Sequence, residues 1–156
     1  MMSAVLSKEP AMYPGMYLYK RVVQAKLFID SHYVEPIDLD DIADEALFSK
    51  FHFIRLFKSV YGQTPHQYRT QLRIEKAMEL LGAGQSVSHA CFDVGFESLG
   101  SFTMLFKRRT GLNPSLYRKK MIERTMAIKE QPLYFIPGCF AEQKGWKNSN
   151  FEENNA

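Results

Sequence analysis

The stretch Ser49–Arg69, SKFHFIRLFKSVYGQTPHQYR, recurs 49 residues later as Ser98–Arg118, SLGSFTMLFKRRTGLNPSLYR. The two stretches align without a gap, and nine of their positions carry the same residue. These pairs are Ser49/Ser98, Phe53/Phe102, Leu56/Leu105, Phe57/Phe106, Lys58/Lys107, Gly62/Gly111, Pro65/Pro114, Tyr68/Tyr117 and Arg69/Arg118. A solenoid needs about three or more repeats to bury its faces. Two copies therefore indicate a duplicated small module.

Each copy has the pattern of one helix that ends at a glycine and a second helix that follows at once. Four apolar residues of the first copy recur at helical spacing and are predicted to face inward: Phe53, Leu56, Phe57 and Val60. We expect Ser49 to cap this helix at its start and Gly62 to end it in the left-handed conformation. Thr64 and Pro65 suit the N-cap and first position of the next helix.

The whole chain extends this pattern into an all-α fold with two helix-turn-helix subdomains, homeodomain-like, joined by a long linker helix, with about seven helices. The expected segments are a flexible lead-in (1–16), a first subdomain (17–63), the linker helix (64–82), a second subdomain (83–129) and a partly disordered C-terminal extension (130–156). We expect the first helix to begin at Tyr17, and a short helix over Leu39–Ala46 to be capped by Asp38. The apolar run Leu133–Phe140 is expected to fold back onto the domain surface, with a partner-binding strand or anchor as the alternative.

Charge is distributed unevenly along the chain. The net charge of +3 is modest, but residues 50–74 and 98–122 contain no Asp or Glu, whereas six acids crowd into residues 35–45. The basic residues of the two acid-free segments are Lys50, Arg55, Lys58, Arg69, Arg73, Lys107, Arg108, Arg109, Arg118, Lys119 and Lys120. A solvated helix face explains one such segment equally well, but two in register favour a polyanionic partner.

A short helix, a tight turn and a second helix with a basic outer face is the plan of a DNA-binding helix-turn-helix. The second helix of each copy, about 49–60 and 98–109, is narrow enough to enter the major groove of double-stranded DNA. Two such helices on one linker helix are expected to reach adjacent major-groove segments, which lie roughly 34 Å apart, or to bend the DNA if they are closer.

The pattern FxRLFKxxxGxTPxxYR at Phe53–Arg69, followed by AxxxGFxSxxxFxxxFKxxxGxxPxxYR at Cys91–Arg118, resembles the DNA-binding domain of the AraC/XylS family of bacterial transcription regulators. The resemblance covers about residues 18–120, and Cys91 stands where the family usually has alanine. It implies a two-module, seven-helix domain that binds asymmetric sites and activates transcription by engaging RNA polymerase.

The resemblance places base-reading residues on the outer faces of the two recognition helices. The matching positions are Phe51, Ile54, Arg55, Leu99, Gly100, Thr103 and Met104. Candidates for contacts to the DNA backbone are Ser49, Lys50, His52, Lys58, Ser98, Ser101, Lys107 and Arg108. Arg55 can make a bidentate contact to guanine, worth roughly 1–3 kcal/mol of discrimination. Because Ile54, Leu99 and Met104 are apolar where the family is commonly polar or basic, we expect the second module to contribute more through phosphate than through base contacts.

The remaining patterns exclude several function classes. No GxSxG, P-loop or paired-carboxylate arrangement is present, so we expect no enzyme and no cofactor. The four histidines are scattered, and no metal site is expected. Cys91 is predicted to be a core residue and Cys139 to be exposed. With no signal peptide and no apolar run of roughly 20 residues, we expect a cytoplasmic, nucleoid-associated protein with no membrane partner.

One alternative remains for the function: a helical protein-interaction module with weak or non-specific DNA binding. The expected partners of the regulator are double-stranded DNA and, as the resemblance implies, RNA polymerase, with the chain a monomer or weak dimer. About 16 residues precede the domain, so the chain resembles the stand-alone members of the family or a fragment of a larger regulator. The Met1-Met2 start favours the stand-alone type.

Overall fold

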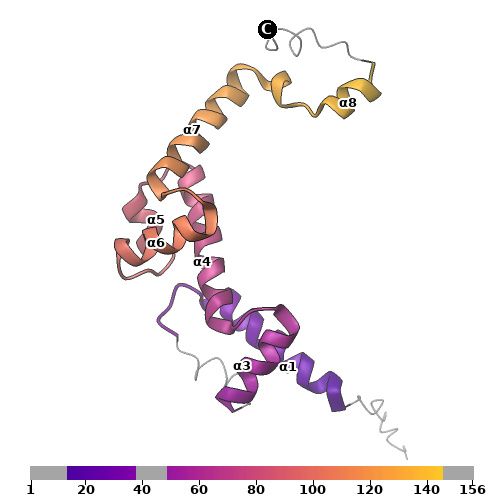
Figure 1. The fold of residues 1–156 in the computed structure, drawn as a ribbon, viewed down its shortest axis with the longest axis vertical. Coiled ribbons are helices and arrows are strands. Elements are labelled where there is room, and N and C mark those ends of the chain that lie inside the picture. Colours follow the sequence, from indigo (N-terminus) through magenta and orange to yellow (C-terminus); the bar gives the residue numbers. More distant parts are fainter. Residues whose placement is uncertain (1–13, 38–48, 146–156) are drawn as a thin grey trace, which may run out of the picture.

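The computed structural model of the chain describes residues 14–37 and 49–145, and these contain helices and no strand (Figure 1). The elements are α1 (Pro14–His32), α3 (Lys50–Tyr61), α4 (Pro65–Gly82), α5 (Val87–Asp93), α6 (Leu99–Thr110), α7 (Pro114–Glu130), the 3-10 helix η1 (Pro132–Phe135) and α8 (Gly138–Gln143). The predicted all-α fold with about seven helices is confirmed. The helix predicted at Leu39–Ala46, with its cap Asp38, lies outside the described residues.

The first helix begins earlier than predicted. It starts at Pro14 rather than Tyr17, so residues 14–16 of the expected lead-in are helical. Proline is well suited to the first turn of a helix, because the N–H that it lacks would have no helical partner there. Pro14 thus suits the start of the helix.

Helix α4 runs between two groups of helices and packs against both (Figure 1). It begins with the predicted N-cap Thr64 and Pro65, and Thr64 and Gln67 form a capping box in which each side chain accepts the other's backbone N–H. Helices α1 and α3 pack near its start, and α5, α6 and α7 pack nearer its end (Figure 1). The two modules therefore share one continuous helix.

The core of the first module lies between α1, α3 and the start of α4. Phe53 and Phe57 are fully buried against a cluster of small and aliphatic α1 residues, which are Val22, Ala25 and Ile29. Val60, predicted to face inward, is instead 38% exposed. Tyr61 occupies the core face in its place, with its ring centroid 4.7 Å from that of Phe57. The inward stripe of α3 thus follows an i, i+4, i+8 spacing, which drifts away from Val60.

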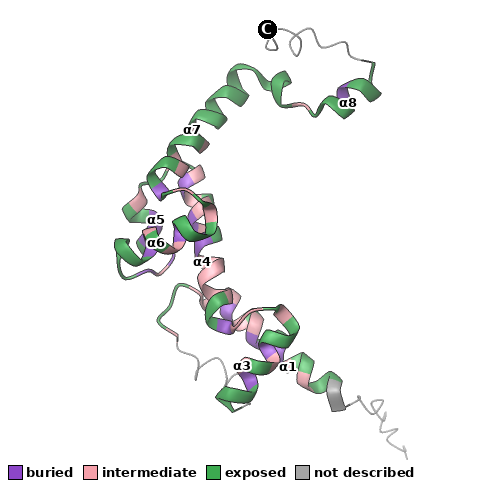
Figure 2. Ribbon diagram, viewed as in Figure 1, coloured by how far each residue is buried: buried purple, intermediate pink, exposed green. Residues whose placement is uncertain are grey.

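The second module has a larger core that includes the end of α4. Its buried members are Ile74, Ala77, Leu81, Ala90, Cys91, Val94, Phe96, Phe102 and Phe106. The buried position of Cys91, predicted from helical spacing, is confirmed. Figure 2 shows that buried residues other than Ala141 of α8 gather at these two places along the chain, whereas the second half of α7 is exposed.

Helices α3 and α6 end in the same way and begin differently. Both end at a glycine in the left-handed conformation, Gly62 with φ 73° and Gly111 with φ 76°, as predicted. The Ser98 hydroxyl accepts the backbone N–H of Ser101 and caps α6. Ser49 holds the same N-cap position on α3, but its side chain makes no capping hydrogen bond. The prediction that Ser49 caps its helix is therefore wrong for the side chain, although its extended backbone suits the position.

The C-terminal extension stays close to α7 at its start. Helix η1 lies against the end of α7, and Gly138–Gln143 forms the short helix α8. The apolar side chains of Leu133, Phe135 and Phe140 are exposed, so the expected burial of this run on the domain surface is wrong. The run stays exposed because Pro137 interrupts it and because α7 extends away from both cores before the run begins (Figure 1).

Candidate nucleic-acid interface

The outer face of α3 is set by its buried stripe. Because Phe53 and Phe57 point into the core with Leu56 beside them, helical geometry directs the opposite face of α3 outward. Phe51 is 78% exposed, and Arg55 and Lys58 are exposed, whereas Ile54 is half-buried. The face thus offers an aromatic ring, a guanidinium and an ammonium group on one side of a helix.

The outer face of α6 is built the same way and is chemically poorer. Met104 is 62% exposed and Leu99 is 40% exposed, Gly100 is also exposed, and Thr103 is half-buried. Lys107 is exposed in the last turn. Of the four predicted base readers here, only Thr103 carries a side-chain hydrogen-bonding group.

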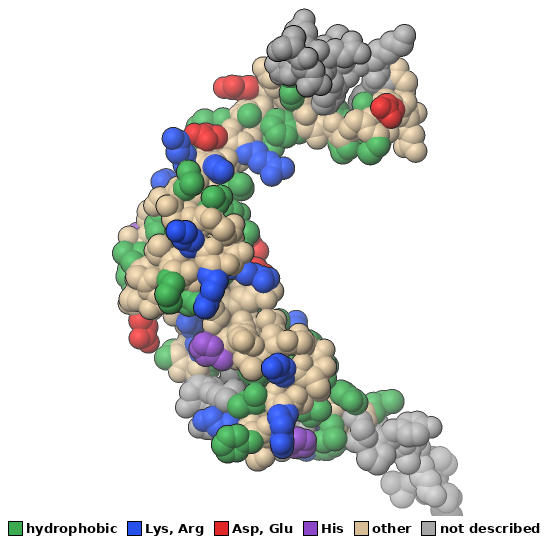
Figure 3. Space-filling model, viewed as in Figure 1, with side chains coloured by type: hydrophobic (Ala, Val, Ile, Leu, Met, Phe, Trp, Pro, Cys, Tyr) green, Lys and Arg blue, Asp and Glu red, His purple; other side chains and the backbone are tan. Residues whose placement is uncertain are grey.

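The residues predicted to contact the DNA backbone all lie at the surface. The exposed set is Ser49, Lys50, His52, Lys58, Ser98, Ser101, Lys107 and Arg108. They fall into two groups, one at α3 and one at α6, and basic side chains lie over both modules on the face that Figure 3 shows. The two groups therefore form separate patches.

Three arginines of the acid-free segments serve the fold instead. Arg69 donates to the backbone carbonyls of Tyr33, Glu35 and Ile37, the first at 3.1 Å and the last at 2.6 Å. Arg118, its equivalent in the second copy, donates to the carbonyl of Gly84 at 2.9 and 3.1 Å. These guanidiniums satisfy loop carbonyls that no helix would satisfy. Their hydrogen-bond donors are thus used within the fold, although their positive charges still add to the field of the two segments.

The third arginine, Arg73, joins the two modules. It lies on α4 and donates to the carbonyl of Tyr33 at 2.6 Å and to those of Val34 and Glu35 at 3.1 and 3.2 Å. Burial, and secondly the positive charge of Arg69, lowers the pKa of Arg73 to about 10. Arg73 therefore remains protonated at neutral pH, and burial also lowers the pKa of Arg69.

Gly95 completes this contact from the second module. Its φ of 86° is in the left-handed region, and a Cβ placed on it would lie 2.3 Å from the carbonyl oxygen of Val34. The loop that follows α1 therefore packs closely against the turn between α5 and α6, and the Arg73 guanidinium contacts both. We call this contact, made by residues 33–35, Arg73 and Gly95, the inter-module brace.

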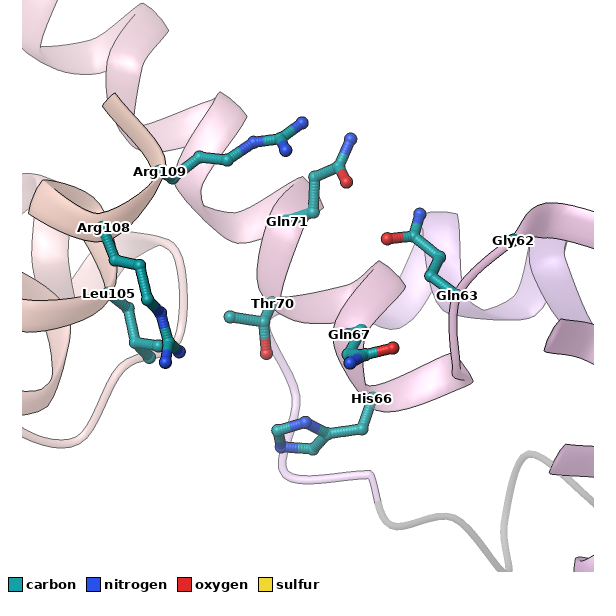
Figure 4. Close-up of a pocket in the computed structure, with 9 residues that line it drawn as sticks. All are labelled: Gly62, Gln63, His66, Gln67, Thr70, Gln71, Leu105, Arg108 and Arg109. Atoms are coloured by element: carbon teal, nitrogen blue, oxygen red, sulfur yellow. The ribbon is translucent and has the colours of Figure 1, made fainter. Parts of the chain in front are cut away.

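A polar groove of about 530 Å³ lies between the modules on another side of α4 (Figure 4). Its lining comes from the end of α3, the first half of α4 and the second half of α6. The lining residues are Gly62, Gln63, His66, Gln67, Thr70, Gln71, Leu105, Arg108 and Arg109. In Figure 4 the side chains of His66 and Arg108 extend into the space between α4 and α6.

Only Arg108 of this lining was among the predicted site residues. The polar residues of α4 recur in two pairs four positions apart, His66-Gln67 and Thr70-Gln71, which places them on one helix face. That pattern is a signal in the sequence for a polar face on the linker helix. It does not show what the face lies against, because that depends on the position of α6.

The side chains that could hold a metal ion are not clustered in the described part of the chain. Within residues 14–37 and 49–145 no three His, Cys, Asp or Glu side chains are grouped so as to hold a metal ion. Of the cysteines, Cys139 is exposed as predicted, and burial raises the pKa of the Cys91 thiol. Over the same residues, no helix has the length and apolar character needed to cross a membrane.

Comparisons with known proteins agree with this geometry. A family model described as a helix-turn-helix domain matches residues 42–120, just over half of the chain. The MmsAB operon regulatory protein of Pseudomonas aeruginosa is 35% identical over 95 residues, which are 60% of this chain and 31% of that protein. The regulatory protein SoxS of Salmonella typhimurium is 29% identical over 105 residues, 66% of this chain and 98% of that protein. The chain thus spans about a third of the length of the first relative and nearly all of the second.

Solved structures give the same result. The DNA-binding domain of AdpA, a global transcriptional factor solved in complex with a target DNA, superposes with a TM-score of 0.61 at 26% identity, over 72% of this chain and 96% of that one. The C-terminal domain of AraT, a response regulator from Geobacillus stearothermophilus, gives a TM-score of 0.61 at 26% identity, over 64% of this chain and 84% of that one. Together with the duplicated helix-turn-helix modules, these matches mean that the chain belongs to the AraC family of helix-turn-helix DNA-binding transcriptional regulators, which are not enzymes.

Proposed function

We propose that the chain binds double-stranded DNA at specific sequences, with α3 and α6 in adjacent major-groove segments. The observation that carries this proposal is the equivalence of the two helices. Each has a buried phenylalanine pair on one side, an exposed outer face on the other and a position fixed against the shared helix α4. The target DNA named in the AdpA structure belongs to that protein, and it supports the same kind of partner here.

The two helices have unequal roles in this proposal. Arg55 on α3 is exposed and can donate two hydrogen bonds to one guanine. At the equivalent position of α6 stands Met104, which can only touch apolar groups such as the thymine methyl. We therefore assign most of the base reading to α3, with Phe51 and Ile54 beside Arg55, and assign to α6 mainly backbone contacts from Ser98, Ser101 and Lys107.

Substitution of the two equivalent positions tests this assignment. Sites bound by the wild-type protein are selected from random-sequence DNA, and the affinities for the selected site and for single-base variants are then measured at fixed salt. Arg55→Ala should lower discrimination at one position by about 1–3 kcal/mol, roughly 5- to 150-fold. Met104→Ala should leave discrimination nearly unchanged. The assignment is wrong if Met104→Ala changes sequence preference as much as Arg55→Ala does.

The proposed outcome of binding is activation of transcription through contact with RNA polymerase, with the chain acting as a monomer or weak dimer. Transcription from a promoter carrying the selected site, with purified polymerase, tests it. Increased transcript supports an activator, and decreased transcript would indicate a repressor.

A helical protein-interaction module is the second candidate. The exposed apolar residues Leu99 and Met104 favour it, as do Leu133 and Phe140 in the extension. Salt dependence separates the candidates, because DNA binding through several phosphate contacts must weaken steeply between about 50 and 200 mM salt. A protein-interaction module has no such requirement for DNA.

A further inference from the structure

The polar groove of Figure 4 lies between the recognition helices and is part of neither outer face. We propose that this groove binds the sugar-phosphate backbone of the DNA segment between the two major-groove contacts, with Arg108 and His66 directed at phosphate oxygens. The proposal rests on the proposed function and adds a third contact to it, supplied largely by the linker helix α4.

The charge of the groove suits a phosphate. None of the nine lining residues is acidic, and two are arginines. Arg109 lies at the edge near Glu75, with 3.8 Å between its Nη2 and the carboxylate Oε1, and Gln71 donates to the same carboxylate at 2.7 Å. Arg108 is exposed, and no ion pair among the described residues engages it. Its guanidinium is therefore available for an oxygen ligand that is not part of this chain.

The other groups of the groove are hydrogen-bond donors of the kind that contact DNA phosphates. His66 and Gln67 stand in the first turn of α4, where the helix dipole adds positive potential. The Gln67 side-chain oxygen accepts the backbone N–H of Thr64, so the part of this side chain that can act in the groove is its amide NH₂. Thr70 follows one turn later with a hydroxyl group.

The position of the groove favours a polymer over a small molecule. One wall is Gly62 and Gln63, directly after α3, and the other is Leu105 and Arg108 of α6. A duplex that contacts both recognition helices must cross the space between these walls. A small-molecule site is usually enclosed, whereas this groove opens to solvent, and seven of its nine lining residues have polar side chains.

Salt titration with a matched control tests the groove. The probe is a duplex selected from random-sequence DNA by the wild-type protein, together with a scrambled duplex of the same length. Arg108→Gln should reduce the slope of log affinity against log salt by about 0.9, the value for one lost phosphate contact. The wild-type protein should thus lose about 3.5-fold more affinity than this variant between 50 and 200 mM salt. The loss should be similar on both duplexes, because phosphates carry no sequence information.

Arg124→Gln is the matched control. Arg124 is exposed on α7, outside the groove, and its substitution removes the same charge. Its salt slope should equal that of the wild-type protein. Thr70→Val, which keeps the shape of the side chain and removes the hydroxyl, should weaken both duplexes by a similar factor without changing the slope.

A second readout locates the contact on the DNA. A neutral methylphosphonate at one phosphate between the two recognition-helix contacts should weaken binding of the wild-type protein and have no further effect on Arg108→Gln. The groove proposal is overturned if Arg108→Gln keeps the wild-type slope, or if the sensitive phosphates lie only beside the recognition helices. A different outcome would contradict the proposed function itself: the wild-type protein would select no sites from random DNA and would show no salt-dependent binding to DNA.

Discussion

Replacing Gly95 by alanine tests whether the inter-module brace fixes the fold. Two costs add at this position. Alanine at a φ of 86° is strained by about 1–2 kcal/mol. Its Cβ would also lie 2.3 Å from the Val34 carbonyl oxygen and 2.8 Å from Nη2 of Arg73, distances at which the loop or the arginine must move. Moving either disturbs the hydrogen bonds of Arg73, and a hydrogen bond to a charged group contributes about 1.5–3 kcal/mol.

We therefore expect Gly95→Ala to lower the free energy of unfolding by about 3–5 kcal/mol, measured by urea denaturation. Gly84 and Gly111 are the matched controls. Their φ values of 93° and 76° lie on either side of that of Gly95, and a Cβ on either one meets no atom within 4 Å. Gly84→Ala and Gly111→Ala should thus cost only the backbone strain, about 1–2 kcal/mol. If Gly95→Ala costs no more than these two variants, the close approach of the modules does not constrain the fold and the reasoning is refuted.

Three further predictions follow from the helix ends, the cores and the thiols. Ser98→Ala should destabilise the protein by about 1 kcal/mol because it removes the cap of α6, whereas Ser49→Ala, which removes no capping bond, should cost little in the same denaturation assay. Phe57→Ala and Phe106→Ala should each cost about 3–5 kcal/mol, and hydrogen exchange should show loss of protection mainly in α3 for the first and in α6 for the second, because the two side chains belong to separate cores. With a thiol reagent at pH 8, Cys139 should react at once and Cys91 only on unfolding. Burial raises the pKa of Cys91 above its ordinary 9.0, so the folded state holds the thiol proton more tightly than the unfolded state does. The contribution of this difference to the free energy of unfolding is complete below pH 9 and is lost as the pH rises through the raised pKa.

The features that could be predicted from sequence are those set within one helix and its caps. The glycines that end α3 and α6, the start of α4 at Pro65 and the burial of Cys91 all follow from local spacing. Val60 shows the limit of that reasoning, because its spacing fits an inward face as well as that of Tyr61 does. Which of the two is buried depends on where α1 and α4 pack, and that is a tertiary property.

The arginines mark a second limit. Arg55 and Arg69 have the same charge in the sequence, and both lie in a segment without acids. Arg69 and Arg73 face the loop after α1, whose carbonyls lack helical partners. Both guanidiniums donate hydrogen bonds to these carbonyls, so their donors are not available to DNA. A long side chain can reach backbone groups more than 30 positions away, so charge patterning alone overstates the surface available to DNA. The groove was missed for the same reason, since α4 and α6 form it only after folding.

The brace and the shared helix together limit how α3 and α6 can lie on DNA in the proposed complex. Helix α4 is continuous from Pro65 to Gly82 and carries core residues of both modules, and Arg73 ties the loop after α1 to the second module. The separation of α3 and α6 is therefore set by packed structure and not by a flexible linker. When a rigid separation differs from the helical repeat of DNA, the duplex has to deform, and the cost depends on the sequence between the contacts. If α3 and α6 bind DNA as proposed, base pairs between the two contacts can influence affinity without being touched, which would give a protein that reads bases mainly through α3 a second source of specificity.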